Sequence, residues 1–198
     1  MISGIILSTG ASFHNGIAPA LPKIEETAFL RHIVDVLRSA RVIDIVIVVN
    51  AEENETAKDL SWFDGKIAVN PSWKTGELSS IRAGLDNVSP DDLHGVMVCP
   101  IDHRLITQKL LVNLLQSFWK SKKDIIIPTY NGTRGHPIIF GTKLFEALRS
   151  APQGEGVRGV IQNHQNEIHE LQTDGQGAIL TISSTDEYEK YSGVLKNA

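Results

Sequence analysis

The residues of this sequence that could do chemistry follow short apolar segments. The first such segment, 2–8, runs into a loop that contains Thr9, Gly10, Ser12 and Gly16. Glycines after a strand let backbone N–H groups approach a phosphate, but the spacing matches neither a P-loop nor the dinucleotide fingerprint Gly-x-Gly-x-x-Gly. Taken alone, the loop fits either a phosphate cradle or an ordinary turn after a strand.

A second polar group follows the segment 66–70. Asn70 is followed by Trp73, Gly76 and Ser79. Trp73 and Ser79 could recognise a nucleotide base, or they could pack against and cap the helix that follows. Gly76 suits a backbone conformation that other residues avoid, whether or not a nucleotide binds.

The third and fourth polar groups contain charged side chains and a histidine. Asp102 comes directly after the apolar run 95–100, and Arg134, Gly135 and His136 precede another apolar stretch. A carboxylate at a strand end is a suitable Mg²⁺ ligand, and an exposed turn acid is the alternative. His136 could contact a substrate or be a hydrogen-bonded histidine at a strand entry.

The elements that must position these residues alternate between apolar segments and amphipathic helical patterns. That alternation is typical of a mostly parallel sheet covered by helices, so we expect one α/β domain over residues 1–198 with a three-layer, doubly wound fold. The predicted strands are 2–8, 44–50, 66–70, 95–100, 124–128, 136–140, 167–171 and 178–183. The predicted helices are 29–40, 77–87, 107–119, 142–149, 156–164 and one from residue 185. Because ligands bind beyond the carboxyl ends of such strands, the four polar groups are expected to form one site.

Composition narrows the function classes. The chain has 198 residues and a formal net charge of −4, with no cluster of Lys and Arg, which argues against nucleic acid as a partner. It has no apolar run long enough to span a membrane. The single Cys99 lies in an apolar run and excludes an internal disulfide. We therefore expect a cytoplasmic protein without a membrane partner.

Three of the polar groups together carry a family resemblance. The pattern Asn-x-x-Trp-x-x-Gly-x-x-Ser at 70–79, Asp102 at a strand end, and Arg-Gly-His-Pro at 134–137 resemble the MobA-like NTP transferases. These are the molybdenum cofactor cytidylyl- and guanylyltransferases. The resemblance runs from residue 2 to about residue 188 and is closer to the cytidylyl branch. It implies a nucleotide-diphospho-sugar transferase-like, Rossmann-type fold.

The resemblance also implies a reaction. A phosphate on the acceptor attacks the α-phosphorus of a nucleoside triphosphate, and pyrophosphate leaves with Mg²⁺ bridging the phosphates; Asp102 would be the metal ligand. A Gly-x-Arg element at 156–158 adds Arg158 to the acceptor residues Arg134, Gly135 and His136, with a plain surface charge as its alternative. The partners implied are the nucleotide, a small phosphorylated pterin-like acceptor and a molybdoenzyme maturation protein. The nucleotide-binding residues implied are Leu7, Ser8, Thr9, Gly10, Ser12, Gly16, Asn70, Gly76 and Ser79.

The sequence departs from the family pattern at charged positions. His14 stands where the family has Arg, Pro19 where it has Lys, and Ser183 where it has a second metal carboxylate. His14 and Lys23 are candidate replacements, since Lys23 lies four residues beyond Pro19, about 13 Å of extended chain at most. Arg104 is a third candidate.

Two hypotheses follow. The first is a Mg²⁺-dependent nucleotidyltransferase, and the second is a catalytically degenerate nucleotide-binding or regulatory protein with the same fold. An NAD-linked dehydrogenase would also fit the fold but lacks its glycine fingerprint.

Overall fold

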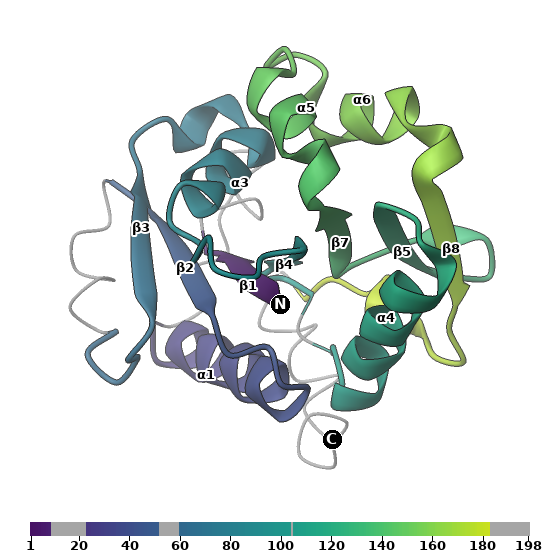
Figure 1. The fold of residues 1–198 in the computed structure, drawn as a ribbon. Coiled ribbons are helices and arrows are strands. Elements are labelled where there is room, and N and C mark those ends of the chain that lie inside the picture. Colours follow the sequence, from purple (N-terminus) through teal and green to yellow (C-terminus); the bar gives the residue numbers. More distant parts are fainter. Residues whose placement is uncertain (9–22, 52–59, 104, 183–198) are drawn as a thin grey trace.

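The computed structural model describes residues 1–8, 23–51, 60–103 and 105–182. Over these residues eight strands form one sheet in the order β3-β2-β1-β4-β7-β5-β6, with β8 also paired to β5 (Figure 1). The strands are β1 Ile2–Leu7, β2 Ile45–Asn50, β3 Lys66–Asn70, β4 Gly95–Pro100, β5 Ile125–Tyr130, β6 Thr133–Arg134, β7 Ile138–Gly141 and β8 Ile168–Gln172.

One half of the sheet is parallel and the other is mixed. β1 pairs in parallel with β2 and β4, and β2 pairs in parallel with β3. β7 runs antiparallel between β4 and β5. β5 pairs with β8 in parallel along one edge and with β6 and β7 along the other. The predicted mostly parallel α/β sheet is confirmed.

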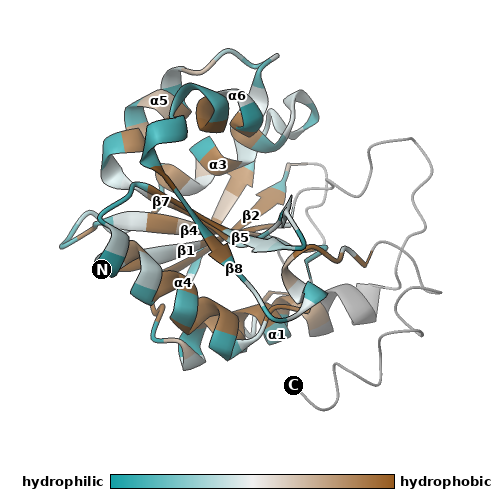
Figure 2. Ribbon diagram, turned by 90° about the vertical axis from the view of Figure 1, so that its right-hand side faces the viewer, coloured by the Kyte–Doolittle hydropathy of each residue, from teal (hydrophilic) through white to brown (hydrophobic). Residues whose placement is uncertain are grey.

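Helices cover both faces of the sheet (Figures 1 and 2). α1 and α4 lie on one face, and α3, α5 and α6 lie on the other. The three-layer prediction is therefore confirmed. The helices are α1 Lys23–Ser39, α3 Glu77–Leu85, α4 Gln108–Ser121, α5 Phe145–Ser150 and α6 Gly156–Asn163, and the 3₁₀ turns are η2 Trp73–Thr75, η3 Thr142–Leu144, η4 Gln165–Glu167 and η5 Gln176–Ala178.

The apolar runs of the sequence become strands buried on both faces. In β2, Ile45, Ile47 and Val49 pack toward α1 and α4, whereas Val46 and Val48 pack toward the other helices. A strand between two helix layers has no polar face, which explains the unbroken aliphatic run. Figure 2 shows these central strands as the most hydrophobic part of the ribbon.

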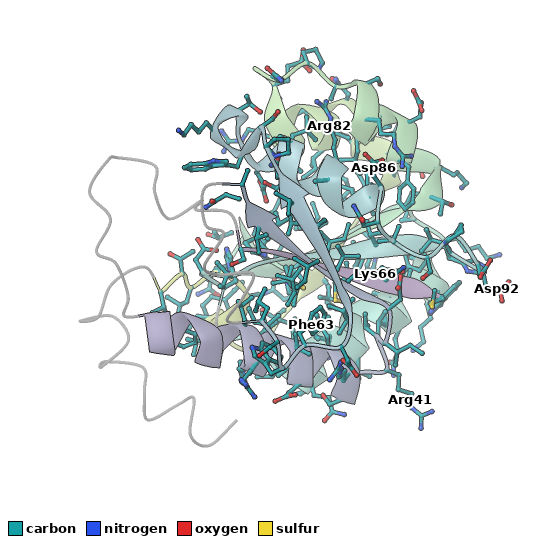
Figure 3. The ribbon with its side chains drawn as sticks, turned by 90° about the vertical axis from the view of Figure 1, so that its left-hand side faces the viewer. Arg41, Phe63, Lys66, Arg82, Asp86 and Asp92 are labelled. Atoms are coloured by element: carbon teal, nitrogen blue, oxygen red, sulfur yellow. The ribbon has the colours of Figure 1, made fainter. Side chains whose placement is uncertain are left out.

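Helix α3 carries residues of the site and is fastened to the neighbouring helix. Arg82 donates hydrogen bonds from Nε to the carbonyl of Leu148 at 3.0 Å and from its terminal nitrogen to the carbonyl of Ala151 at 2.5 Å. Arg149 and Asp86 form a second link between α5 and α3 at 3.2 Å. Figure 3 labels Arg82 and Asp86. These contacts fix the position of α3 relative to α5.

Two predictions at the C-terminal side of the chain had different outcomes. The strand predicted over 178–183 is wrong, since its described part is the end of η5 followed by irregular backbone. This segment makes single contacts instead of a ladder: the carbonyl of Ala178 accepts from His136 N at 2.8 Å, and Ile182 N donates to the carbonyl of Asp102 at 2.9 Å. The helix predicted from residue 185 lies outside the described residues.

Strand direction brings the polar loops to one rim. Leu7 lies opposite Pro100, so β1 and β4 end together. Because β7 is antiparallel to β4, its first residue, Ile138, lies opposite Val98 near that same end. The loop that precedes β7 therefore meets the residues that follow β4.

Candidate functional site

Asp102 lies just beyond β4, at the centre of this rim. The residue is partly buried, and its Oδ1 atom is buried without a hydrogen-bond partner among the described residues. A buried oxygen of this kind is costly unless a ligand satisfies it. The predicted metal carboxylate therefore has an oxygen available for a cation or another ligand.

Two histidines lie beside Asp102. The rings of His103 and His136 are 4.6 Å apart between centroids, and within the described chain neither Nδ1 atom has a hydrogen-bond partner, although both are buried. His103 is only 8% exposed. His103 is not predictable from the sequence, because adjacency to Asp102 is its only signal there and the contact with His136 arises only in the fold.

Both histidines are held in the neutral form. Burial, and to a smaller extent the nearby His103, lowers the pKa of His136 to about 3. Burial also lowers the pKa of His103, against the opposing effects of Asp102 and a hydrogen bond to the backbone of Ala178. A neutral imidazole donates from one nitrogen and accepts at the other, so these rings offer hydrogen bonds and no positive charge.

Gly135 has a backbone role at the rim. Its N–H donates to the carbonyl of Pro128 at 2.9 Å, and a Cβ atom at this position would lie 2.1 Å from the carbonyl oxygen of Ala178. Only glycine allows the two backbones to approach so closely. Gly135 thus fixes the loop that carries His136.

A cavity of about 320 Å³ opens next to these residues. It is lined by all four predicted acceptor residues, which come from two segments of the chain: Arg134, Gly135 and His136 from one, and Arg158 from the other. Glu77 and Gln162 also line it, together with the apolar side chains of Ile127, Ile138, Val157 and Ile161. The structure therefore brings the predicted acceptor residues together.

Arg134 does not stand alone in this cavity. Its guanidinium donates from Nε to Glu170 Oε1 at 2.7 Å, and a second nitrogen lies 2.6 Å from the same oxygen. Glu170 belongs to β8, across β5 from Arg134. Glu170 was not predicted from the sequence, since no motif surrounds it. Arg158 is exposed on α6, so its charge faces solvent at the cavity.

Glu77 is a second residue that sequence reasoning missed. It is the first residue of α3 and occupies an unspecified position of the Gly-x-x-Ser pattern. Burial, and to a smaller extent the negative charge of Asp102, raises its pKa to about 7. An acidic side chain directly after a glycine turn was the signal that could have identified it.

The loop between β3 and α3 is held by its own side chains. Asn70 is buried; its amide donates to the hydroxyls of Ser79 and Ser80 at 2.9 Å each and accepts from Ser72 N at 2.9 Å. Gly76 has φ +110°, a conformation that favours glycine. Asn70 and Gly76 therefore shape the loop, and their part in nucleotide binding stays a prediction.

The first loop is described only at its start. Leu7 is buried in the core, and Ser8 is buried with its N–H bonded to the carbonyl of Val48 at 2.9 Å. The Ser8 hydroxyl has no partner among the described residues. The other predicted residues of this region, Thr9, Gly10, Ser12, His14, Gly16 and Pro19, lie outside the described residues, as do Arg104, Ser183 and the side chain of Lys23.

The part of the chain that the structure describes contains no three His, Cys, Asp or Glu side chains placed to hold a metal by themselves. Mg²⁺ commonly takes one or two carboxylates and completes its shell with water and substrate phosphates. Asp102, with its unpartnered oxygen, fits that kind of site. No described helix is long and apolar enough to cross a membrane.

Known proteins share this sequence pattern and fold. Residues 4–168 match the model of the MobA-like NTP transferase domain. The probable molybdenum cofactor guanylyltransferase of Bacillus mycoides (strain KBAB4) is 26% identical over 137 residues, which cover 69% of this chain and 66% of that protein. The match thus spans just under two thirds of that relative's length.

Solved structures show the same fold. An Rv0371c homologue from Mycobacterium sp. strain JC1 has a TM-score of 0.77 at 18% identity, covering 99% of this chain and 97% of its own. Rv0371c from Mycobacterium tuberculosis H37Rv in complex with manganese has a TM-score of 0.71 at 18% identity, with 96% of each chain covered. Molybdopterin-guanine dinucleotide biosynthesis protein A from Archaeoglobus fulgidus has a TM-score of 0.67 at 14% identity over 100% of both chains.

The family match extends across the strands and loops that build the rim, from β1 to the start of β8. It includes Asp102, the β3–α3 loop and the residues of the cavity. This chain belongs to the MobA-like NTP transferase family.

Proposed function

We propose that this protein transfers a nucleoside monophosphate from a nucleoside triphosphate, CTP in the first instance, to a phosphorylated pterin-like acceptor. The observation that carries the proposal is the arrangement of the rim, where Asp102 lies beside a cavity lined by Arg134, Gly135, His136 and Arg158. CTP is favoured by the Arg-Gly-His-Pro element, and the Bacillus relative makes GTP the main competitor. A cytoplasmic location and a molybdoenzyme maturation partner are part of the same proposal.

The proposed reaction exchanges one P–O bond for another. An oxygen of the acceptor phosphate bonds to the α-phosphorus, and the bond from that phosphorus to the α,β-bridging oxygen breaks, so pyrophosphate leaves with the electron pair. A phosphate monoester is already ionised near pH 7 and needs no general base. His136, with its pKa lowered by burial, is suited to hydrogen bonding with the acceptor and not to carrying charge.

The cationic and metal-holding roles fall to other residues. The exposed guanidinium of Arg158 can meet the acceptor phosphate, and Arg134 can do so in exchange for its bond to Glu170. Asp102 would hold Mg²⁺, which, when bound, supplies charge neutralisation for the triphosphate and the leaving pyrophosphate. Manganese in the Rv0371c complex supports a divalent ion in proteins of this fold.

The second hypothesis, a degenerate nucleotide-binding or regulatory homologue, is motivated by His14, Pro19 and Ser183 at positions where the family has charged side chains. Such a homologue would bind the nucleotide without transferring it.

For an active transferase, we propose Lys23 and His14 as substitutes for the missing cations.

Calorimetric titration with CTP, GTP and ATP, each with and without Mg²⁺, tests the binding step. We expect CTP to bind more tightly when Mg²⁺ is present. Asp102→Ala should remove the Mg²⁺-dependent part of the affinity and lower any turnover by ~10²–10³-fold, the cost of losing one charge-stabilising group. Retained turnover in this variant would contradict the role given to Asp102, and absence of binding to all three nucleotides would contradict the proposed function.

A further inference from the structure

Two carboxylates lie close together at the rim. Glu77 lines the cavity together with His136, and the ring of His136 contacts the ring of His103. His103 directly follows Asp102, so the cavity that Glu77 and His136 share adjoins the residues after β4. The negative charge of Asp102 helps to raise the pKa of Glu77, which agrees with this placement.

Neither carboxylate is neutralised by a side chain that the structure describes. The described ion pairs include neither Glu77 nor Asp102. Ionising both carboxylates in a poorly solvated place costs free energy, because the two charges repel each other, and the buried Asp102 Oδ1 atom also lacks a hydrogen bond among the described residues. A divalent cation between them would remove both costs.

We propose that Glu77 supplies the second carboxylate of a divalent-metal site in which Asp102 supplies the first. The site would thereby regain the negative charge that Ser183 does not provide. This inference rests on the proposed function for the presence of the metal. Two carboxylates, completed by water and triphosphate oxygens, form a shell that suits Mg²⁺ or Mn²⁺.

Glu170 is the acid paired with the cavity residue Arg134. Glu77 differs from Glu170, because it lines the cavity without an ion pair among the described residues. Its position in α3, which Arg82 fastens to α5, makes its backbone a rigid support for a ligand.

Direct Mn²⁺ binding tests the inference without relying on activity. Electron paramagnetic resonance of free Mn²⁺ would be titrated with the full chain, alone and with CTP, for the wild type, Glu77→Gln, Asp102→Asn and Glu146→Gln. Glu146 is a matched control, because it is an exposed glutamate in the first turn of another helix of the same layer. Thermal melting of each variant establishes that it is folded.

We expect Glu77→Gln to weaken Mn²⁺ binding ~10-fold or more, as Asp102→Asn does, since even residues outside the ligand shell cost ~10–100-fold. Glu146→Gln should match the wild type, and Glu77→Asp should recover part of the loss. Wild-type affinity in Glu77→Gln, with a loss in Asp102→Asn alone, would overturn the inference and leave the proposed function standing. No Mn²⁺ binding by the wild type would overturn it too. Mn²⁺ binding that depends on Glu77 but is indifferent to nucleotides would support the metal site and contradict the proposed function.

Discussion

At the scale of single residues, the site combines two groups whose pKa values are shifted in opposite directions, downward for His136 and upward for Glu77. Burial keeps His136 neutral well below the ordinary range of a histidine, and burial together with Asp102 keeps Glu77 protonated up to about pH 7. The first effect removes a cation from the cavity, and the second reduces the repulsion between two acids. Both groups are thus neutral at slightly acidic pH.

These opposite shifts predict opposite effects on the pH dependence of stability. Between about pH 3 and 6.5, His136 binds a proton in the unfolded chain and not in the folded one, so its contribution to stability falls as the pH is lowered. Between about pH 4.5 and 7, Glu77 is protonated in the folded chain and ionised in the unfolded one, so its contribution rises as the pH is lowered. The two contributions oppose each other where the ranges overlap.

We therefore expect His136→Gln to lose less stability than the wild type between pH 6.5 and 5.5, and Glu77→Gln to lose more. Each difference should be about 1 kcal/mol, since one pH unit of differential protonation corresponds to 1.4 kcal/mol. Urea unfolding at pH 5.5, 6.5 and 7.5 measures both. Parallel pH profiles for the three proteins would contradict the described environments of His136 and Glu77.

The residues of the site differ in how far the sequence could predict them. Asp102 was predictable, because an acid directly after a buried parallel strand lies at the ligand-binding end of the sheet. His103 and Glu77 were not, since each acquires its role from side chains far away in the sequence. Glu170 was missed for the same reason. Its bond to Arg134 forms only because β6, which carries Arg134, and β8, which carries Glu170, both pair with β5.

At the scale of elements, the rim depends on close contact between the loop before β7 and the segment after β8. The carbonyl of Ala178 accepts the His136 N–H at 2.8 Å, and the backbone of Gly135 lies against the same carbonyl. The expected strand over 178–183 failed here, because isolated hydrogen bonds replace a ladder. An apolar run in the sequence does not show whether a segment forms a strand or makes only isolated hydrogen bonds.

Gly135→Ala tests this contact. The added Cβ would meet a backbone oxygen at 2.1 Å, which cannot be relieved by a side-chain rotation, so we expect a loss of about 1–3 kcal/mol in the free energy of unfolding. Gly175→Ala is the control, because nothing lies within 4 Å of its added Cβ and its φ is −133°. Equal stability of the two variants in urea unfolding would contradict the close approach at Gly135.

Most elements were predictable because their signals are local. The apolar runs that became β3 and β4 begin and end at the predicted residues, and Thr107 caps α4 by accepting a hydrogen bond from Leu110 N at 3.3 Å. β6 was missed, since two residues carry no period. α1 begins at Lys23, six residues before the predicted start, because its first turns lack the apolar spacing on which the prediction relied.

At the scale of the whole molecule, a doubly wound sheet brings segments from both halves of the chain to one rim. β1 and β4 end side by side, the antiparallel β7 begins there, and α6 adds Arg158 to the adjoining cavity. The family match covers the residues that form this rim, and the fold brings those residues together. The charged positions that differ from the family pattern are the reason to test turnover separately from binding.

The central claim is that the rim transfers a nucleotide to an acceptor, and pyrophosphate release under single-turnover conditions tests it most directly. The full chain would be mixed with CTP, Mg²⁺ and a phosphorylated pterin acceptor, and pyrophosphate would be followed by ³¹P NMR. We predict one pyrophosphate per acceptor consumed, with the cytidine monophosphate joined to the acceptor phosphate. Intact CTP, or CTP breakdown at the same rate without the acceptor, would contradict the claim.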